Sequence, residues 1–185
     1  MEGWRETTIK DEFYLGRGRV ISQSEIEDND GIYPVYSSQS TNKGEMGKIF
    51  TFDFEGEYIT WTTDGAYAGT VFHRNGKFNC TNVCGTLKAI DETKIDHLFV
   101  AYLLSTISKG HVSYVGNPKL MNGVMSKIPI SIPYSLKEQK KIASILSTID
   151  QTIDQTEQLI AKYKNIKQGL MHDLLTWELH SKLAG

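Results

Sequence analysis

A row of apolar residues, spaced alternately four and three apart, runs toward the C-terminus of the chain. Its members are Ile142, Leu146, Ile149, Ile153, Ile160, Tyr163, Leu170 and Leu174. Only Thr156 and Lys167 interrupt this register, and no proline lies between Ile142 and Trp177. Such spacing predicts one amphipathic helix with a coiled-coil seam. Because a helix of about forty residues spans roughly 60 Å, we expect part of it to pair with another helix.

Three residues mark the start of this helix. Pro133 disfavours helix just before it, and Ser135 with Glu138 has the spacing of a capping box. We therefore expect a globular domain over residues 1–134, the helix over 135–176 and a short tail over 177–185. The first segment is long enough to bury one hydrophobic core.

The globular segment is expected to be α+β and rich in strands. Runs of β-branched and aromatic residues, with one proline, predict extended segments at 33–38, 48–52, 58–62, 83–89 and 128–132. The dipeptide Asn75-Gly76 predicts a hairpin turn, and the acidic stretch 24–31 predicts an exposed loop. Asp96 is expected to cap an internal helix that ends near Gly110, and 120–125 is expected to form a helical turn.

Charge is unevenly distributed although the net charge is only −2. Residues 1–64 carry six basic and thirteen acidic side chains, whereas residues 65–149 carry ten basic and four acidic ones. A basic face directed at phosphates and an ordinary mixed surface are equally compatible with this distribution.

The cysteine spacing argues against a zinc site, and the hydropathy argues against a membrane protein. Cys80 and Cys84 lack two further ligands at zinc spacing, so we expect buried, unpaired thiols. No apolar run reaches the length of a membrane span and the N-terminus has no apolar signal region, which predicts a cytoplasmic protein without membrane contact. No motif predicts a catalytic residue, and none predicts a metal or cofactor site.

Two polar loops and several basic residues are candidates for contact with a nucleic acid. Segment 60–70 combines hydroxyl groups, a carboxylate, two glycines and a tyrosine, which suits base edges. The base-reading candidates are Thr62, Thr63, Asp64 and Tyr67, with Ser37 and Ser38 from loop 36–43. The phosphate-contacting candidates are Lys43, Lys48, Arg74, Lys77 and Lys119. By composition alone, a strand-connecting turn is the simpler interpretation of segment 60–70.

Several motifs along nearly the whole chain carry a resemblance to a known family. The loop motifs are Tyr33-Pro34-Val35-Tyr36-Ser37-Ser38, Gly65-Ala66 through Gly69-Thr70-Val71, Gly76-Lys77-Phe78 leading to Thr81-Asn82, and Lys119-Leu120-Met121-Asn122. The most specific is the junction 130–150, with Glu138-Gln139 and Ile142-Ala143, running into 167–171. In this order they resemble one half of the specificity subunit of type I restriction–modification systems.

The resemblance implies a target recognition domain followed by a conserved spacer helix. It implies that the domain reads half of a bipartite site in double-stranded DNA. It also implies that the helix packs antiparallel on a second spacer helix and docks DNA methyltransferase subunits, with a restriction or translocase subunit as a further candidate partner. The chain itself would be non-catalytic and would hold no cofactor, since S-adenosylmethionine would belong to the methyltransferase.

The chain has one domain and one helix where a full subunit of that family has two of each. We therefore expect a half-subunit that forms a homodimer through the seam and reads a palindromic site. Two other hypotheses stay open at this point. One is a coiled-coil protein–protein adaptor without DNA binding, and the other is an enzyme such as a nuclease or the tail of a fused methyltransferase.

Overall fold

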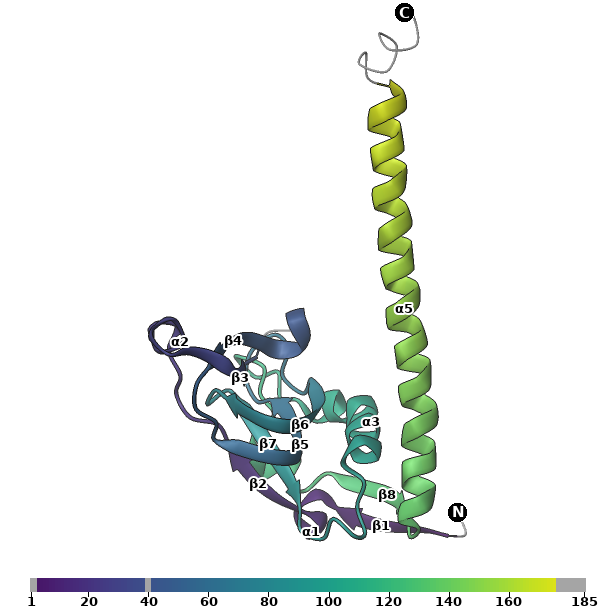
Figure 1. The fold of residues 1–185 in the computed structure, drawn as a ribbon. Helices are drawn as coiled ribbons and strands as arrows, with labels where there is room; N and C mark the ends of the chain where they lie inside the picture. Colours follow the sequence, from purple (N-terminus) through teal and green to yellow (C-terminus); the bar gives the residue numbers. More distant parts are fainter. Residues whose placement is uncertain (1–2, 39–40, 176–185) are drawn as a thin grey trace, which may run out of the picture. The chain divides into compact units, whose positions relative to one another are not determined.

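The structure is a computed structural model that describes residues 3–38 and 41–175 (Figure 1). Contacts between Cα atoms divide the chain into a first unit, residues 1–143, and a second unit, residues 144–185. Strands dominate the first unit, and the described part of the second unit, up to Leu175, is a single helix. Within the described residues, no helix combines the length and the apolar character needed to cross a bilayer.

A six-stranded mixed sheet forms the centre of the first unit. From one edge to the other, its strands are β2 (Phe13–Arg17), β7 (Cys84–Ala89), β5 (Phe54–Thr62), β6 (Val71–Cys80), β3 (Asp30–Tyr36) and β4 (Glu45–Ile49). Only the short pairing of β3 with β6 is parallel. The long antiparallel pairing of β5 with β6 joins the two halves of this sheet.

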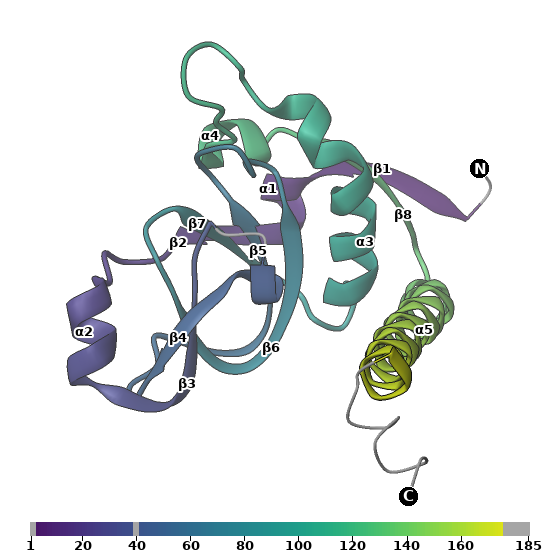
Figure 2. The same cartoon turned by 90° about the horizontal axis from the view of Figure 1, so that it is seen from above.

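A second sheet of two antiparallel strands brings the two ends of the first unit together. It pairs β1 (Trp4–Thr8) with β8 (Pro129–Pro133). The remaining elements of the unit are α1 (Ile9–Glu12), α2 (Gln23–Asp28), η1 (Thr41–Gly44), α3 (His97–Ile107), η2 (Ser108–His111) and α4 (Asn122–Met125). Helix α3 packs on β5 and β6, as Figure 2 shows from above.

The main hydrophobic core lies between the six-stranded sheet, α3 and β8. Trp61, Phe99, Leu104 and Ile130 are all buried in it. The indole N–H of Trp61 donates a hydrogen bond of 2.8 Å to the carbonyl of Leu120. A Cβ atom on Gly85 would lie 2.2 Å from the Trp61 ring, so only glycine fits beneath this side chain.

The long helix, α5 (Leu136–Leu175), begins inside the first unit. The backbone N–H of Glu138 donates to Ser135 Oγ at 3.4 Å, as the capping box predicts. Gln139 and Ala143 are buried, and Ile142 packs on the main core. The first two turns of α5 therefore belong to the first unit, which ends at Ala143, nine residues after the predicted end of the globular domain.

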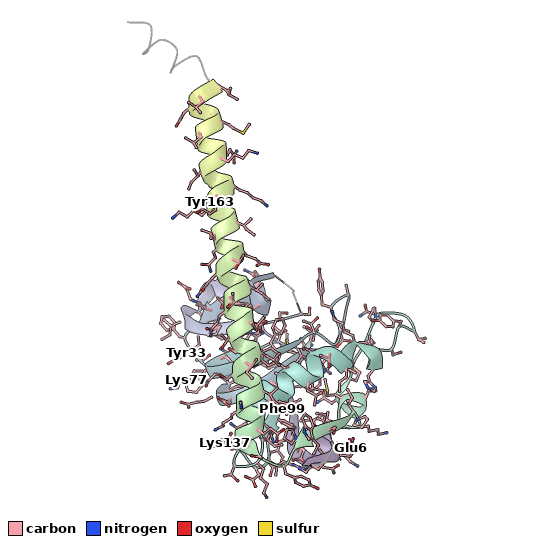
Figure 3. All side chains as sticks on the ribbon, turned by 90° about the vertical axis from the view of Figure 1, so that its right-hand side faces the viewer. Glu6, Tyr33, Lys77, Phe99, Lys137 and Tyr163 are labelled. Carbon is pink, nitrogen blue, oxygen red and sulfur yellow. The ribbon has the colours of Figure 1, made fainter. Side chains whose placement is uncertain are left out.

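The other seam residues carry large exposed apolar surfaces. From Leu146 to Leu174, the seven remaining apolar members of the predicted seam are between 40% and 62% exposed. Tyr163 is the most exposed of them and is labelled in Figure 3. The predicted tail, 177–185, lies outside the described residues.

Two local predictions are wrong. Asn75 and Gly76 lie inside β6, where Gly76 (φ +99°) pairs with Gly56 (φ +103°) of β5. Two glycines facing each other let both strands twist and continue, so the chain reverses at 63–70 instead. The stretch 24–31 contains most of α2, because Ser22 caps it by accepting a hydrogen bond from the Glu25 N–H.

Several other local predictions are confirmed. Asp96 caps α3 by accepting a hydrogen bond of 2.8 Å from the Phe99 N–H. Cys80 and Cys84 are buried and unpaired, and burial raises the pKa of the Cys84 thiol to about 11. Burial also raises the pKa of the Cys80 thiol. Both thiols are therefore poor nucleophiles at neutral pH.

Candidate nucleic-acid interface

The polar loop between β5 and β6 is a tightly closed turn. The Thr62 N–H donates to the Thr70 carbonyl at 2.9 Å, and the Gly69 N–H donates to the Thr62 carbonyl at 2.8 Å. Thr62 and Thr63 are only 1% and 0% exposed, so their side chains cannot reach a partner's surface. This corrects the expectation that both threonines read bases. Tyr67, in contrast, is 49% exposed at the turn.

Arg17, at the end of β2, reaches this turn from another strand. Its Nη2 donates to Thr63 Oγ1 at 2.9 Å and lies 3.3 Å from Asp64 Oδ2. The Thr63 hydroxyl in turn donates to Asp64 Oδ2 at 2.6 Å. The three side chains, here called the Arg17 cluster, thus fix one edge of the guanidinium. The bonds of this guanidinium to described residues all use Nη2, which leaves the Nη1 and Nε donors for a partner.

Arg17 was not among the residues predicted from the sequence. The available signal was its place between two glycines, Gly16 and Gly18, directly after a strand. Only the sheet order, which sets β2 beside β7 and β7 beside β5, brings Arg17 to the end of β5. Thr63, which was expected to read a base, instead accepts a hydrogen bond from Arg17 and helps to hold its side chain in place.

A second loop, 113–119, joins the β5–β6 turn from the other side. Ser113 and Lys119 exchange two backbone hydrogen bonds, of 2.9 and 3.0 Å, which close the loop. The Gly65 N–H donates to the Pro118 carbonyl at 3.0 Å, and Asp64 forms a backbone bridge with Lys119. The structure thus brings together Asp64 and Lys119, two residues predicted from separate motifs. Loop 113–119 extends beyond the rest of the first unit next to α4 (Figure 2).

The segment that carries this loop is free of acidic residues. Between His97 and Lys137 the sequence contains no aspartate or glutamate. Lys109, Lys119 and Lys127 are exposed there, and none forms an ion pair with a described residue. Uncompensated lysines create a positive potential that attracts a polyanion. The basic half predicted from sequence therefore includes one stretch of surface whose charged residues are all lysines.

Arg74 does not lie on this surface, which corrects its expected role in phosphate contact. It is 7% exposed, and its guanidinium carbon lies 3.5 Å from the centre of the Tyr36 ring and 4.4 Å from that of Phe72. Its Nη2 donates to the Lys43 carbonyl at 2.7 Å, and burial lowers the pKa of Arg74. Arg74 therefore anchors η1 to β6 instead of binding a phosphate.

The other predicted residues lie toward the opposite edge of the sheet. Ser37 accepts a hydrogen bond from Thr81 at 3.0 Å, and Ser38 is half-buried. Lys43 and Lys48 are exposed on η1 and β4, far along the strand order from β2. Lys43 and Lys48 therefore do not join the Arg17 cluster, whereas Ser37 bonds to Thr81, whose backbone bridges Arg19, two residues after Arg17.

Lys77 is exposed but already has partners in the chain. Its Nζ lies 3.7 Å from a Glu55 carboxylate oxygen and 4.3 Å from the centre of the Phe52 ring. Tyr33 lies nearby, with its ring centre 6.0 Å from the same Nζ (Figure 3). A phosphate would have to compete with Glu55 for this lysine. Lys77 is therefore a weaker candidate than Lys119.

The chain is similar to a family of known proteins over most of its length. The family model described as "Type I restriction modification DNA specificity domain" matches residues 1–165. The chain belongs to this family. The resemblance seen in the sequence motifs is thereby confirmed.

Relatives in the type I specificity family occur in Mycoplasma pneumoniae. One is the type I restriction enzyme MpnII specificity subunit, 47% identical over 124 residues, which are 66% of this chain and 37% of that protein. Another is named for the N-terminus of the type I specificity subunit S.MpnORF289P, 50% identical over 123 residues, which are 66% of this chain and 65% of that protein. In both cases the matched segment is less than two thirds of the relative's length.

Solved structures share the fold. The S subunit of a type I restriction-modification system from M. genitalium has a TM-score of 0.74 at 21% identity, covering 97% of this chain and 48% of that chain. The HsdS subunit from Thermoanaerobacter tengcongensis has a TM-score of 0.64 at 15% identity, covering 93% and 44%. The predicted class, an α+β domain followed by a long C-terminal helix, is confirmed by these likenesses.

Proposed function

We propose that this chain reads one half of a bipartite site in double-stranded DNA as the specificity component of a type I restriction–modification system. The observation that carries the proposal is the convergence of Arg17, Asp64 and Lys119 beside an acid-free, lysine-bearing segment. Family membership gives this surface its expected partner. The chain contributes recognition and no chemistry of its own.

The side chains divide between positioning and reading. Lys109, Lys119 and Lys127 contact phosphates, since a mobile ammonium suits a charge whose position varies. Arg17 reads a base edge with its remaining N–H donors, and Asp64 holds it in place. Tyr67 lies exposed on the same turn and adds a hydroxyl donor.

The second part of our proposal is that two copies of the chain form a homodimer through their α5 helices. In an antiparallel coiled coil, each seam residue faces a seam residue of the other helix. One register pairs Ile149 with Leu174, Ile153 with Leu170, and Ile160 with Tyr163 of the second copy. The same register places Thr156 opposite Lys167, so the only two polar residues of the seam meet each other. No apolar residue then faces a charge.

Charge on α5 favours the same antiparallel direction. The charged residues over 150–157 are all acidic: Asp150, Asp154 and Glu157. Those over 162–167 are all basic: Lys162, Lys164 and Lys167. In the antiparallel register given above, Glu157 of one copy lies beside Lys164 and Lys167 of the other, whereas a parallel pair sets each charged residue next to its own counterpart. Two-fold symmetry would make the recognised site palindromic, with an unread gap between its halves.

Methyltransferase subunits complete the proposed assembly. They supply S-adenosylmethionine and the methyl transfer, and the chain directs them to the site. The test is to co-express the chain with a methyltransferase subunit encoded beside it and to map methylated bases by sequencing. We expect methylation at one gapped, palindromic motif, and none without the chain. Methylation independent of the chain would contradict the proposal, as would methylation by the chain alone, which would favour an enzyme.

The interface itself is tested by the salt dependence of DNA binding. Lys119→Ala should weaken binding to all sequences and reduce the slope of log affinity against log salt by about one, because one counterion fewer is released. Lys94→Ala is the matched control, since Lys94 already pairs with Asp91 at 2.8 Å. An unchanged slope for Lys119→Ala would remove that residue from the interface. A chain without salt-dependent DNA binding would instead favour the adaptor hypothesis.

A further inference from the structure

Loop 113–119 carries an exposed apolar tip whose role the proposed function does not explain. Val115 is 93% exposed, the highest value among the large apolar side chains that the structure describes, and its neighbour Tyr114 is 70% exposed. Two such side chains at one tip leave most of their apolar area exposed to water. A partner that covers these two side chains would gain the free energy of removing their apolar area from water.

The tip is held firmly from below. Ser113 and Lys119 close the loop with a reciprocal pair of backbone hydrogen bonds. Gly116 turns the chain at φ +75°, a conformation that favours glycine. Leu120, which follows the loop, is buried and donates its N–H to the Thr63 carbonyl at 2.8 Å. The tip is therefore presented by a braced loop, and a partner would meet it at little cost in conformational entropy.

The surroundings of the tip select a polyanion. The loop lies within the acid-free segment, between Lys109 and Lys127, and ends at Lys119. The nearest acidic residue shown by the backbone pairing, Asp64, is engaged with Arg17 and Thr63. A partner protein would be expected to need a broad apolar patch, whereas two apolar side chains in a segment whose charged residues are all lysines suit a nucleic-acid groove.

We propose that Tyr114 and Val115 form an apolar wedge that inserts into the DNA groove and partly unstacks a base step. This inference rests on the proposed function, and it adds a mode of recognition to it. The lysines around the loop hold the backbone while the tip deforms the duplex. Part of the sequence preference then comes from how easily the contacted step unstacks, without a hydrogen bond to its bases.

The test compares side-chain removal at the tip with removal of a matched side chain elsewhere. The probe is a duplex that carries the motif mapped by methylation, and the protein is the full chain. Tyr114→Ala and the double variant Tyr114→Ala, Val115→Ser should each lower affinity about tenfold or more, as loss of one stacked base would. The salt slope should stay unchanged because no charge is removed. Val20→Ser is the control, since Val20 is 72% exposed in the segment after β2.

Insertion is separated from surface contact by the fluorescence of 2-aminopurine placed at successive positions of the duplex. Binding of the wild-type chain should raise emission at one or two adjacent positions, because an unstacked 2-aminopurine is brighter, and the double variant should not raise it. If wild-type chain binds the motif but the variants bind equally well and no position brightens, the wedge is wrong and the proposed function stands.

Two other outcomes also overturn the wedge. If the wild-type chain neither directs methylation nor binds the duplex, the proposed function fails and the wedge fails with it. If the double variant binds DNA normally but no longer co-purifies with the methyltransferase, the tip docks a protein instead. All variants change exposed side chains, so urea unfolding should show near wild-type stability for each.

Discussion

The two units of this chain place similar apolar residues in opposite environments. In the first unit, Trp61, Leu104 and Ile130 are buried between a sheet, a helix and a short strand. In the second unit, Ile149, Ile153 and their neighbours lie on one face of a helix with about half of their surface exposed. The first unit therefore contains the surfaces that bury its core, and the second does not.

This difference shows which part of the chain depends on other molecules. A single helix has little stability in water without tertiary packing, since most helical stability in proteins comes from burying one face. We infer that residues 144–175 obtain most of their stability from a second helix. The junction between the units is Ala143, the last buried residue of α5.

The largest expected effect comes from a charge placed in the seam. Ile153→Asp or Ile160→Asp would bury an unpaired carboxylate at two symmetry-related places in the proposed dimer. Each desolvated charge costs several kcal/mol, so we expect loss of the dimer at micromolar concentration. Sedimentation velocity measures the state of association, and circular dichroism measures the helix that is lost with it.

The matched control for this prediction lies on the same helix. Gln155→Asp adds the same charge outside the predicted seam and should leave the dimer intact. Thr156→Lys sharpens the register, because it would set two lysines opposite each other where Thr156 now faces Lys167. A dimer that survives Ile153→Asp, or a Thr156→Lys variant as stable as wild type, would contradict the proposed pairing.

An intermediate effect is expected inside the first unit. Gln139 is fully buried, where its Oε1 accepts from the Asp96 N–H at 2.9 Å and its Nε2 donates to the carbonyls of Lys94 and Pro133 at 2.9 and 3.0 Å. Gln139→Leu leaves these three backbone groups without that partner. We expect a loss of about 3 kcal/mol in the free energy of unfolding. Urea unfolding followed by tryptophan fluorescence measures it.

The same substitution at an exposed position provides the contrast. Gln158→Leu lies on the exposed part of α5 and should change the stability of the first unit by less than about 0.5 kcal/mol. An equally small effect of Gln139→Leu would show that the first turns of α5 are not part of the globular unit.

Local patterns in the sequence were sufficient where neighbouring residues decide the structure. The capping box at Ser135, the cap at Asp96 and the long helix α5 are all set by residues within a few positions of each other. The hairpin at Asn75-Gly76 failed because its partner glycine, Gly56, is twenty residues away. A dipeptide signal cannot show that another strand will pair through it.

The candidate site is formed by residues that lie even farther apart in the sequence. Asp64 was predicted from a polar turn that carries glycines and Lys119 as a basic residue, and the fold brings their backbones together. Arg17 was missed because its contact with Asp64 spans 47 positions and depends on the strand order. Arg74 was misassigned because sequence cannot show that a guanidinium is buried against two aromatic rings.

The smallest expected effect is a pH dependence that belongs to the first unit alone. His97 is buried; its Nε2 accepts a hydrogen bond of 3.1 Å from the Ala89 N–H, so the neutral ring is the form that fits. Burial lowers the pKa of His97, and burial likewise lowers that of His73. A histidine whose folded pKa is depressed stabilises the fold above its unfolded pKa of about 6.5, and this stability is lost as pH falls below that value.

His97→Asn should therefore flatten the loss of stability between about pH 6.5 and about pH 5, measured by urea unfolding at several pH values. Glu57 works in the opposite direction, because its carboxylate lies 3.4 Å from His97 Nδ1 and raises the pKa of this histidine. Glu57→Gln should depress the pKa of His97 further and make the acid loss steeper. If both variants followed the wild-type profile, the acid sensitivity of the first unit would have to come from its carboxylates, such as Glu12, whose pKa is lowered chiefly by its hydrogen bond with Arg5.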